Sequence, residues 1–120
     1  MRKTLILAAA LLTATAAQAA DANNGKTIFG RCAVCHTVNK GGDNGLGPNL
    51  FGVAGRKAAS LSSYMYSGAL KNSGITWTND KLKAWVAGPS RLVPGTKMAF
   101  GGISNPGQVD DVVAYLGTLK

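Results

Sequence analysis

The sequence is poor in the residues that cross-link small proteins and bind metals, with two cysteines and one histidine among 120 residues. Two cysteines form at most one bond, which excludes a scaffold held by several disulfides. A structural zinc site needs more Cys and His ligands than these. Acidic residues are also scarce, at 5 against 13 Lys and Arg. The net charge of +8 therefore favours acidic partners.

Long hydrophobic runs are absent outside the N-terminus. Residues 1–20 begin with basic residues, continue with an apolar run over 5–12 and end in small residues, the pattern of a secretory signal peptide. We expect export to the periplasm and cleavage after Ala19 or Ala20. The remaining domain, residues 21–120, has a charge of +6 because Arg2 and Lys3 are lost. A membrane anchor needs about 20 consecutive apolar residues, so stable membrane insertion is not expected.

Glycine is abundant, and all 16 glycines lie in residues 21–120, more than twice the usual share of about 7%. A single domain of this size buries about two-thirds of the surface of its unfolded chain, so its own core is thin. These properties exclude a multidomain enzyme, a long coiled coil and a large sheet sandwich. They favour a chain that wraps around something other than protein.

The two cysteines and the histidine form one motif, CAVCH at 32–36. In an exported protein, C-x-x-C-H is the attachment sequence of c-type haem. On one helical turn, two thiols at this spacing reach the vinyl groups of a porphyrin, and the adjacent imidazole lies under the iron. A thioredoxin-like motif would need buried parallel strands, and no long Val/Ile-rich run is present. A plain disulfide would leave His36 incidental. We therefore expect one covalently attached haem c.

Helical patterns separated by glycine-rich loops predict an all-α fold with four or five short helices. Residues 39–55 contain six glycines and are predicted to be loop. The first predicted helix runs from a cap at Asn23 or Asn24 toward the cysteines, and the second covers 60–68. The third runs from a cap at Asn79 and Asp80 to Gly88 and Pro89. The fourth runs from Ser104 or Asn105 to Leu119.

The function of such a haem depends on the group that lies on the other side of the iron from His36. The candidates are Met65, Met98, a lysine, a tyrosine or an open position. Met98 follows a Pro-Gly turn in a segment without helical periodicity, which suits a loop that presents its sulfur to a flat cofactor. Met65 is predicted to pack in the core from the helix over 60–68. The sequence thus favours Met98.

Six stretches of the chain occur in an order that is typical of one family. Together they resemble the class I c-type cytochromes, in particular the small soluble mono-haem cytochromes c of mitochondrial type found in bacteria. The stretches are CAVCHT at 32–37, GPNLFG at 47–52, GRK at 55–57, GITW at 74–77, VPGTKMAF at 93–100 and DVVAYL at 111–116.

The resemblance implies the cytochrome c fold and a role for each matching residue. Cys32 and Cys35 would form the thioether bonds, and His36 and Met98 would be the axial ligands of the iron. The carbonyl of Pro48 would accept a hydrogen bond from the other ring nitrogen of the histidine and fix its orientation.

The resemblance also implies polar partners for the haem propionates, which are costly to bury unpaired. These partners are Arg56, Tyr66, Trp77 and Thr96. Two positions depart from the family, since Trp85 replaces a common tyrosine and Leu70 a common asparagine. Both changes are expected to remove polar groups from around the haem.

The implied function is that of a soluble periplasmic electron carrier, which is not itself an enzyme. It would transfer single electrons between a membrane quinol-oxidising complex and a terminal acceptor, an oxidase or a photosynthetic reaction centre. Two alternatives stay open. One is a haem peroxidase or gas-binding protein with a labile Met98, and the other is a dedicated electron-transfer subunit of a dehydrogenase.

The excess of positive charge indicates how a monomeric carrier would recognise its partners. We expect a ring of cations to surround the exposed haem edge and to steer the protein toward acidic docking faces of membrane redox complexes. Nucleic acid is not an expected partner, because no nucleic-acid motif accompanies the charge. The cations that flank the haem motif and the predicted loop around Met98, residues 93–100, are Arg31, Lys40, Arg91 and Lys97.

Overall fold

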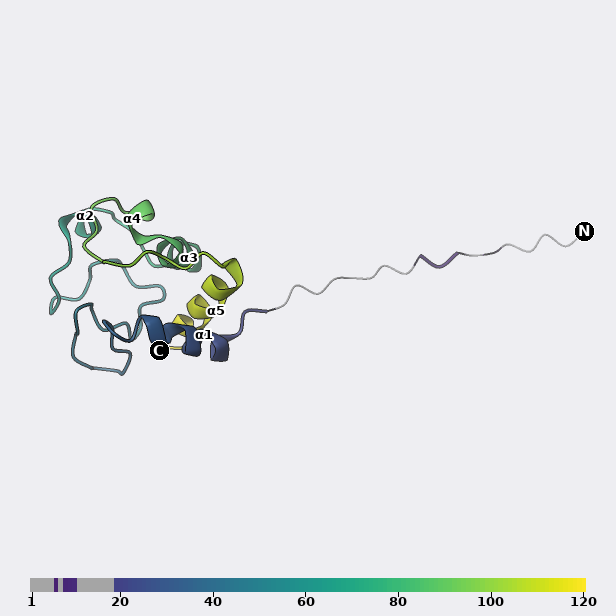
Figure 1. The fold of residues 1–120 in the computed structure, drawn as a ribbon, viewed down its shortest axis with the longest axis horizontal. Coiled ribbons are helices and arrows are strands. Elements are labelled where there is room, and N and C mark those ends of the chain that lie inside the picture. The colour runs from purple at the N-terminus through teal and green to yellow at the C-terminus, as the bar shows by residue number, and fades with distance from the viewer. Residues whose placement is uncertain (1–5, 7, 11–18) are drawn as a thin grey trace, which may run out of the picture.

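The computed structural model of the protein describes residues 6, 8–10 and 19–120 (Figure 1). Most of the predicted signal peptide lies outside the described residues, so its presence and its cleavage stay predictions. No helix in the described ranges is long and apolar enough to cross a membrane.

Short helices joined by long loops make up residues 19–120. No strand forms in this range, where one isolated antiparallel bridge joins Lys57 to Thr76. The predicted all-α class is therefore confirmed. The elements are α1 (Ala22–Ile28) with the 3-10 turn η1 (Phe29–Arg31), α2 (Gly68–Lys71), α3 (Asn79–Ala87), α4 (Pro89–Leu92) and α5 (Pro106–Gly117).

The first helix, α1, begins after Asp21, so the prediction of Asn23 or Asn24 as its cap was wrong. The carboxylate of Asp21 accepts hydrogen bonds from the backbone N–H groups of both asparagines, at 2.9 and 3.1 Å. A charged acceptor also complements the positive end of the helix dipole, which a neutral amide does less well.

The helix α3 lies where the sequence predicts it, with its cap one residue earlier. The hydroxyl of Thr78 accepts a hydrogen bond from the backbone N–H of Lys81 at 3.3 Å, so Asn79 and Asp80 belong to the first turn. The helix ends at Gly88, as predicted, and Pro89 directly begins α4.

The last helix, α5, follows the prediction closely. The side chain of Asn105 accepts a hydrogen bond from the backbone N–H of Gln108 at 3.1 Å, and Pro106 occupies the first helical position. The predicted apolar stripe is buried through Val109, Val112, Val113 and Leu116.

The segment 60–68 is not a helix, contrary to the prediction. It stays irregular as far as Ser67, whose hydroxyl caps the short α2. Tyr64 and Tyr66 both line an interior cavity and pack edge to face, with ring centroids 4.9 Å apart. Met65 between them points the other way and is 77% exposed. Its predicted place in the core was therefore also wrong, because side chains alternate here rather than follow a helical period.

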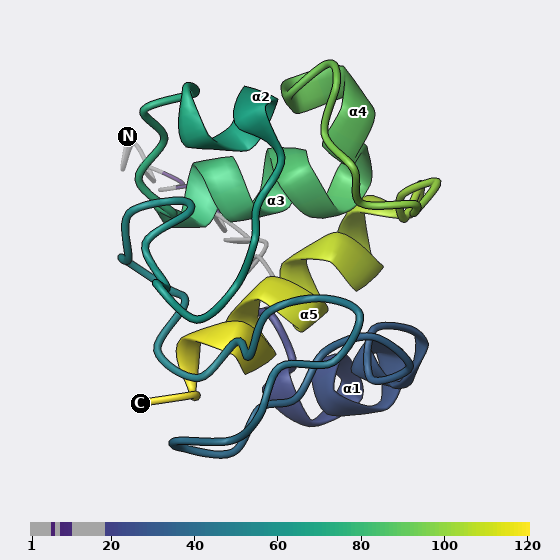
Figure 2. The ribbon, with the colours of Figure 1, turned by 90° about the vertical axis from the view of Figure 1, so that its left-hand side faces the viewer.

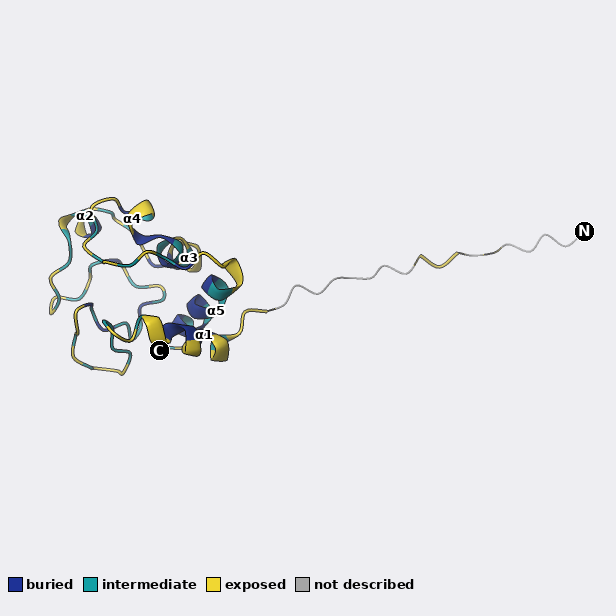
Figure 3. Cartoon of the chain, in the orientation of Figure 1, coloured by how far each residue is buried: buried dark blue, intermediate teal, exposed yellow. Residues whose placement is uncertain are grey.

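The core forms where α5 packs against both α1 and α3 (Figure 2). Buried residues lie on the sides of these helices that face one another (Figure 3). At the crossing of α1 and α5, Gly25 allows the two backbones to touch, since a Cβ there would lie 1.9 Å from the carbonyl oxygen of Asp111. Phe29 packs beside Tyr115, with ring centroids 5.3 Å apart.

Candidate haem-binding site

A cavity of about 600 Å³ lies between the helical core and the loops. Its walls include core side chains such as Phe29, Leu82 and Val112. The cavity therefore occupies the centre of the fold rather than a groove on its surface. The residues with predicted site roles that line it are Cys32, Cys35, His36, Pro48, Arg56, Tyr66, Trp77, Thr96 and Met98.

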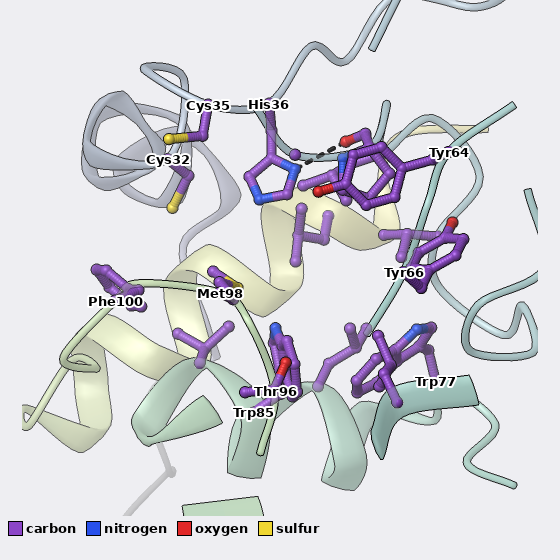
Figure 4. Close-up of a pocket in the computed structure, with 18 of the residues that line it drawn as sticks. Cys32, Cys35, His36, Tyr64, Tyr66, Trp77, Trp85, Thr96, Met98 and Phe100 are labelled. Carbon is purple, nitrogen blue, oxygen red and sulfur yellow. Dashed lines mark hydrogen bonds between the residues drawn. The ribbon is translucent and has the colours of Figure 1, made fainter. Parts of the chain in front are cut away.

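The haem motif follows η1 as one further helical turn. Cys35 and His36 both donate backbone hydrogen bonds to the carbonyl of Cys32, at 3.0 and 2.9 Å. The two cysteines are free, half-buried thiols that share the cavity wall with the histidine (Figure 4). Burial raises the pKa of the Cys32 thiol, against the effect of the nearby Arg31 charge. A thioredoxin-like nucleophile needs a lowered pKa, so the environment does not favour that alternative.

The imidazole of His36 is oriented by Pro48. Its Nδ1 lies 2.7 Å from the Pro48 carbonyl oxygen. Because a carbonyl only accepts, Nδ1 carries the proton and donates it, which leaves Nε2 with a free lone pair. Burial lowers the pKa of the ring, and the Pro48 hydrogen bond opposes this change. Both the neutral state and this tautomer are those that a metal-binding histidine requires.

The loop behind the histidine is held by Asn49, which sequence reasoning did not assign a role. The Asn49 side chain is buried, and its amide nitrogen donates to Thr37 Oγ1 and to the Asn39 carbonyl, both at 2.9 Å. Its side-chain oxygen accepts a hydrogen bond from the Phe51 backbone N–H at 3.0 Å. Asn49 therefore fixes the loop that carries Pro48. The only sign of this role in the sequence was that Asn49 belongs to the stretch GPNLFG at 47–52.

Met98 lies across the cavity from His36 (Figure 4). Its segment is a loop in which the Phe100 backbone N–H donates to the Met98 carbonyl at 3.0 Å. The neighbouring Lys97 is engaged elsewhere, because its ammonium group donates to the Met65 carbonyl and lies 4.6 Å from the centroid of the Tyr64 ring. The geometry thus favours the methionine over this lysine as the second axial group.

Arg56 and Tyr66 reach the cavity from its loop side. The Arg56 guanidinium donates to the carbonyl oxygens of Phe51 and Asn49, at 3.1 and 3.4 Å. These bonds use part of its five N–H groups, so others stay available for an anion in the cavity. The Tyr66 hydroxyl accepts a hydrogen bond from the Leu61 backbone N–H at 3.4 Å and keeps its own proton to donate.

The site fits a haem in its chemistry as well as in its size. Two free thiols and an imidazole with an open Nε2 share one wall, and a thioether sulfur faces them. Guanidinium, hydroxyl and indole donors are among the groups that line a mostly apolar space. Thioether attachment, axial coordination and propionate pairing thus each have a suitable group.

Residues 22–120 match the family described as Cytochrome c. The chain belongs to the cytochrome c family. Cytochrome c2 of Rhodoblastus acidophilus is 44% identical over 102 residues, covering 85% of this chain and 95% of that protein. A cytochrome c homolog of Rickettsia felis is 48% identical over 99 residues, 82% of this chain, but the chain spans only 57% of its length. The structure of cytochrome cH from Methylobacterium extorquens has a TM-score of 0.77 at 50% identity and covers 82% of this chain and 98% of that one.

These comparisons confirm the expected fold and cofactor. The cytochrome c fold is shared with a structure of high identity. Members of the family bind one covalent haem c, and they are electron carriers rather than enzymes.

The two departures from the usual cytochrome c pattern both lie at the cavity. Leu70 is buried and contributes only carbons to the wall. Trp85 packs edge to face on the buried Trp77, with ring centroids 5.1 Å apart. Trp85 also brings an indole N–H to the wall (Figure 4), so its replacement of tyrosine changes the polar group rather than only removing one.

The cations expected around the exposed haem edge of this cytochrome c are not equivalent. Arg31 and Lys97 are exposed and line the cavity, so they lie at its rim. Lys40 and Arg91 are exposed as well, but they lie outside the cavity lining. The structure therefore brings two of the four cations to the site.

Proposed function

We propose that this cytochrome c is an exported, periplasmic carrier of single electrons, with His36 and Met98 as the axial ligands of a haem attached to Cys32 and Cys35. The observation that carries the proposal is the placement of His36 and Met98 on opposite sides of a cavity that both cysteines line. The bound haem supplies an iron that changes between the ferrous and ferric states. Histidine with methionine is the ligand set that raises its reduction potential.

The chain's own residues support a carrier rather than a catalyst. A protein group on each side of the haem leaves no position for oxygen, peroxide or an organic substrate. The wall is mostly apolar, and core side chains make up its inner part. A site of this kind moves an electron without other chemistry, and its donor and acceptor must therefore be other redox proteins. A membrane quinol-oxidising complex and a terminal oxidase or reaction centre fit these roles.

The surface at the cavity mouth suits brief contacts with such partners. Val34 and Leu46 line the cavity and are 79% and 80% exposed. The Tyr64 hydroxyl donates to the Leu46 carbonyl at 2.8 Å, which fixes the backbone of this patch. An apolar centre bordered by cations is the complement of an acidic docking face, and small contacts of this kind allow fast exchange.

The ligand assignment is tested by replacing Met98 with alanine. We expect Met98→Ala to change the ferric optical spectrum and to lower the reduction potential, because the thioether that favours ferrous iron is lost. Met65→Ala is the matched control and should alter neither. An unchanged spectrum and potential in Met98→Ala would show that another group binds the iron.

Carbon monoxide separates the carrier from the alternatives. The native reduced protein should bind it slowly and incompletely, whereas Met98→Ala should bind it at once. Rapid, complete binding to the native protein would support a peroxidase or gas-binding function. Copurification with one dehydrogenase at fixed stoichiometry would support a dedicated subunit.

The docking surface is tested through the rate of electron transfer to an acidic redox partner. We expect the rate to fall as ionic strength rises. Arg31→Gln and Lys97→Gln should lower the rate at low salt more than Lys40→Gln and Arg91→Gln, which remove the same charge outside the cavity lining. Equal effects of all four substitutions would show that net charge acts without a defined docking surface.

A further inference from the structure

The segment at residues 21–24 is attached to α5 by one carboxylate. The backbone N–H of Asp21 donates to Oδ1 of Asp111 at 2.8 Å, and the side-chain amide of Asn24 donates to Oδ2 at the same distance. Both oxygens of Asp111 are thus engaged by a segment about ninety residues earlier in the chain. The contact lies beside the Gly25 crossing, where α1 meets α5.

A second carboxylate lies next to the first, near Ala20. Ala20, Lys83 and Asp110 line a shallow depression of about 300 Å³ between α3 and α5. The ammonium group of Lys83 lies 3.3 Å from Oδ1 of Asp110, which leaves Oδ2 for another partner. Cleavage after Ala19 or Ala20 would make Ala20 or Asp21 the first residue. Two consecutive carboxylates therefore lie at these two residues, in a chain that has only 5 acidic residues.

We propose that Asp110 and Asp111 form the binding site for the N-terminal ammonium group that removal of the signal peptide creates. The proposal rests on the export that the proposed function includes. Hydrolysis of the peptide bond consumes one water molecule and produces a carboxylate on the leader and an amine on the domain. An α-amine with an ordinary pKa of about 7.7–8.0 binds a proton and is mostly charged at neutral pH.

Both expected cleavage positions place the new charge at this site. After cleavage behind Ala20, the ammonium nitrogen is the Asp21 nitrogen, the atom that already lies 2.8 Å from Asp111. After cleavage behind Ala19, it lies one residue earlier, within about 4 Å of that atom. That residue, Ala20, shares its depression with Asp110.

The charge change strengthens the contact between α1 and α5. An ammonium group at the start of a helix is repelled by the positive end of the helix dipole. The carboxylates of Asp111 and Asp21 offset this repulsion. The bond from the Asp21 nitrogen to Asp111 already has a charged acceptor, and cleavage behind Ala20 makes its donor charged as well, so that the bond becomes an ion pair. Processing thus stabilises the helix pair that holds the haem motif against α5.

A double-mutant cycle on the processed, haem-loaded protein tests the proposal. Intact mass first identifies the N-terminal residue, and selective acetylation then removes the charge of the α-amine. We expect acetylation to lower the thermal unfolding midpoint of the unmodified sequence by about 2–5 °C. The same loss is expected in Asp43→Asn, which removes an exposed acid elsewhere. It should disappear in the double variant Asp110→Asn and Asp111→Asn.

Two results would overturn the proposal. One is an equal loss on acetylation with and without the two carboxylates, and the other is a leader that stays attached to the purified exported protein. The reduction potential should be the same before and after acetylation. A failure of the haem-ligand assignment would instead appear in the Met98→Ala and carbon monoxide measurements, which do not involve the N-terminus.

Discussion

At the scale of single residues, the position of His36 depends on the missing side chain of Gly47. A Cβ at position 47 would lie 2.4 Å from Cε1 of the ring and 2.8 Å from Nδ1. The ring would have to leave its place 2.7 Å from the Pro48 carbonyl. We expect Gly47→Ala to lower stability by about 1–3 kcal/mol. Because the orientation of the ligand changes with it, the ferric spectrum and the reduction potential should shift too.

Gly101→Ala is the control for this substitution. A Cβ at Gly101 would meet no atom of the described residues within 4 Å, and the residue lies only three positions after Met98. Its spectrum and potential should match those of the unmodified protein. A Gly47→Ala protein with an unaltered spectrum would show that the glycine does not confine the ring.

The residues that carry the chemistry could be predicted, and so could Pro48, which orients His36, but the role of Asn49 could not. C-x-x-C-H places three functional groups within one helical turn, so a local pattern contains the information. Asn49 acts through hydrogen bonds to Thr37, Asn39 and Phe51, and no spacing rule predicts that combination. The predicted core position of Met65 was wrong for a related reason. Its neighbours Tyr64 and Tyr66 both point into the cavity, so the side chain between them points to solvent.

At the scale of elements, the crossing of α1 and α5 requires a glycine. A Cβ at Gly25 would lie 1.9 Å from the Asp111 carbonyl oxygen and 2.9 Å from Cβ of Tyr115. The backbones would have to separate, so we expect Gly25→Ala to lower the free energy of unfolding by about 3 kcal/mol. Urea unfolding of the haem-loaded protein measures this loss.

Gly30→Ala provides the matched comparison in the same region. A Cβ there would meet nothing within 4 Å in the described part of the chain, and alanine favours helical backbone over glycine by about 1 kcal/mol. It should be neutral or slightly stabilising. Similar losses in the two variants would contradict the steric explanation.

The link between α1 and α5 should also depend on pH through Asp111. Hydrogen bonds from the Asn24 side chain and then from the Asp21 backbone lower the pKa of this carboxyl below its ordinary 3.8. A lowered pKa means that the carboxylate stabilises the folded state above pH 3.8, and that this contribution is lost as the pH falls through the folded value. Asp111→Asn should therefore be less stable than the unmodified protein at neutral pH. Urea midpoints should converge as the medium becomes acidic, whereas a constant difference would exclude this titration.

Longer helices were predictable, and the four-residue helices were not. The helices α3 and α5 contain enough residues for an apolar period, and polar caps mark their starts. The helices α2 and α4 contain too few residues to show a period. Ser67 initiates α2 and Pro89 initiates α4. Isolated turns of this length are unstable in water, so contacts with the rest of the fold decide that they form.

At the scale of the whole molecule, the core and the cavity share their walls. Side chains such as Val86, Val112 and Leu116 belong to the buried cluster and also line the cavity. The size of the domain alone predicted a thin core, and the haem motif explained how a chain with so much loop still folds. The loops from 37 to 67 contain little regular structure, and many of their residues line the cavity that they enclose.

Removal of the haem should therefore unfold the protein rather than leave a hollow fold. The empty space of about 600 Å³ is far larger than the cavity left by any single core truncation, and such truncations already cost about 2–5 kcal/mol each. A domain is stabilised by only about 5–15 kcal/mol. We expect Cys32→Ala with Cys35→Ala, purified without haem, to lose its helical circular dichroism and its cooperative unfolding. Cys32→Ala alone keeps one attachment point and His36, and should stay folded when loaded with haem. A haem-free double variant that unfolds cooperatively would show that the polypeptide core suffices.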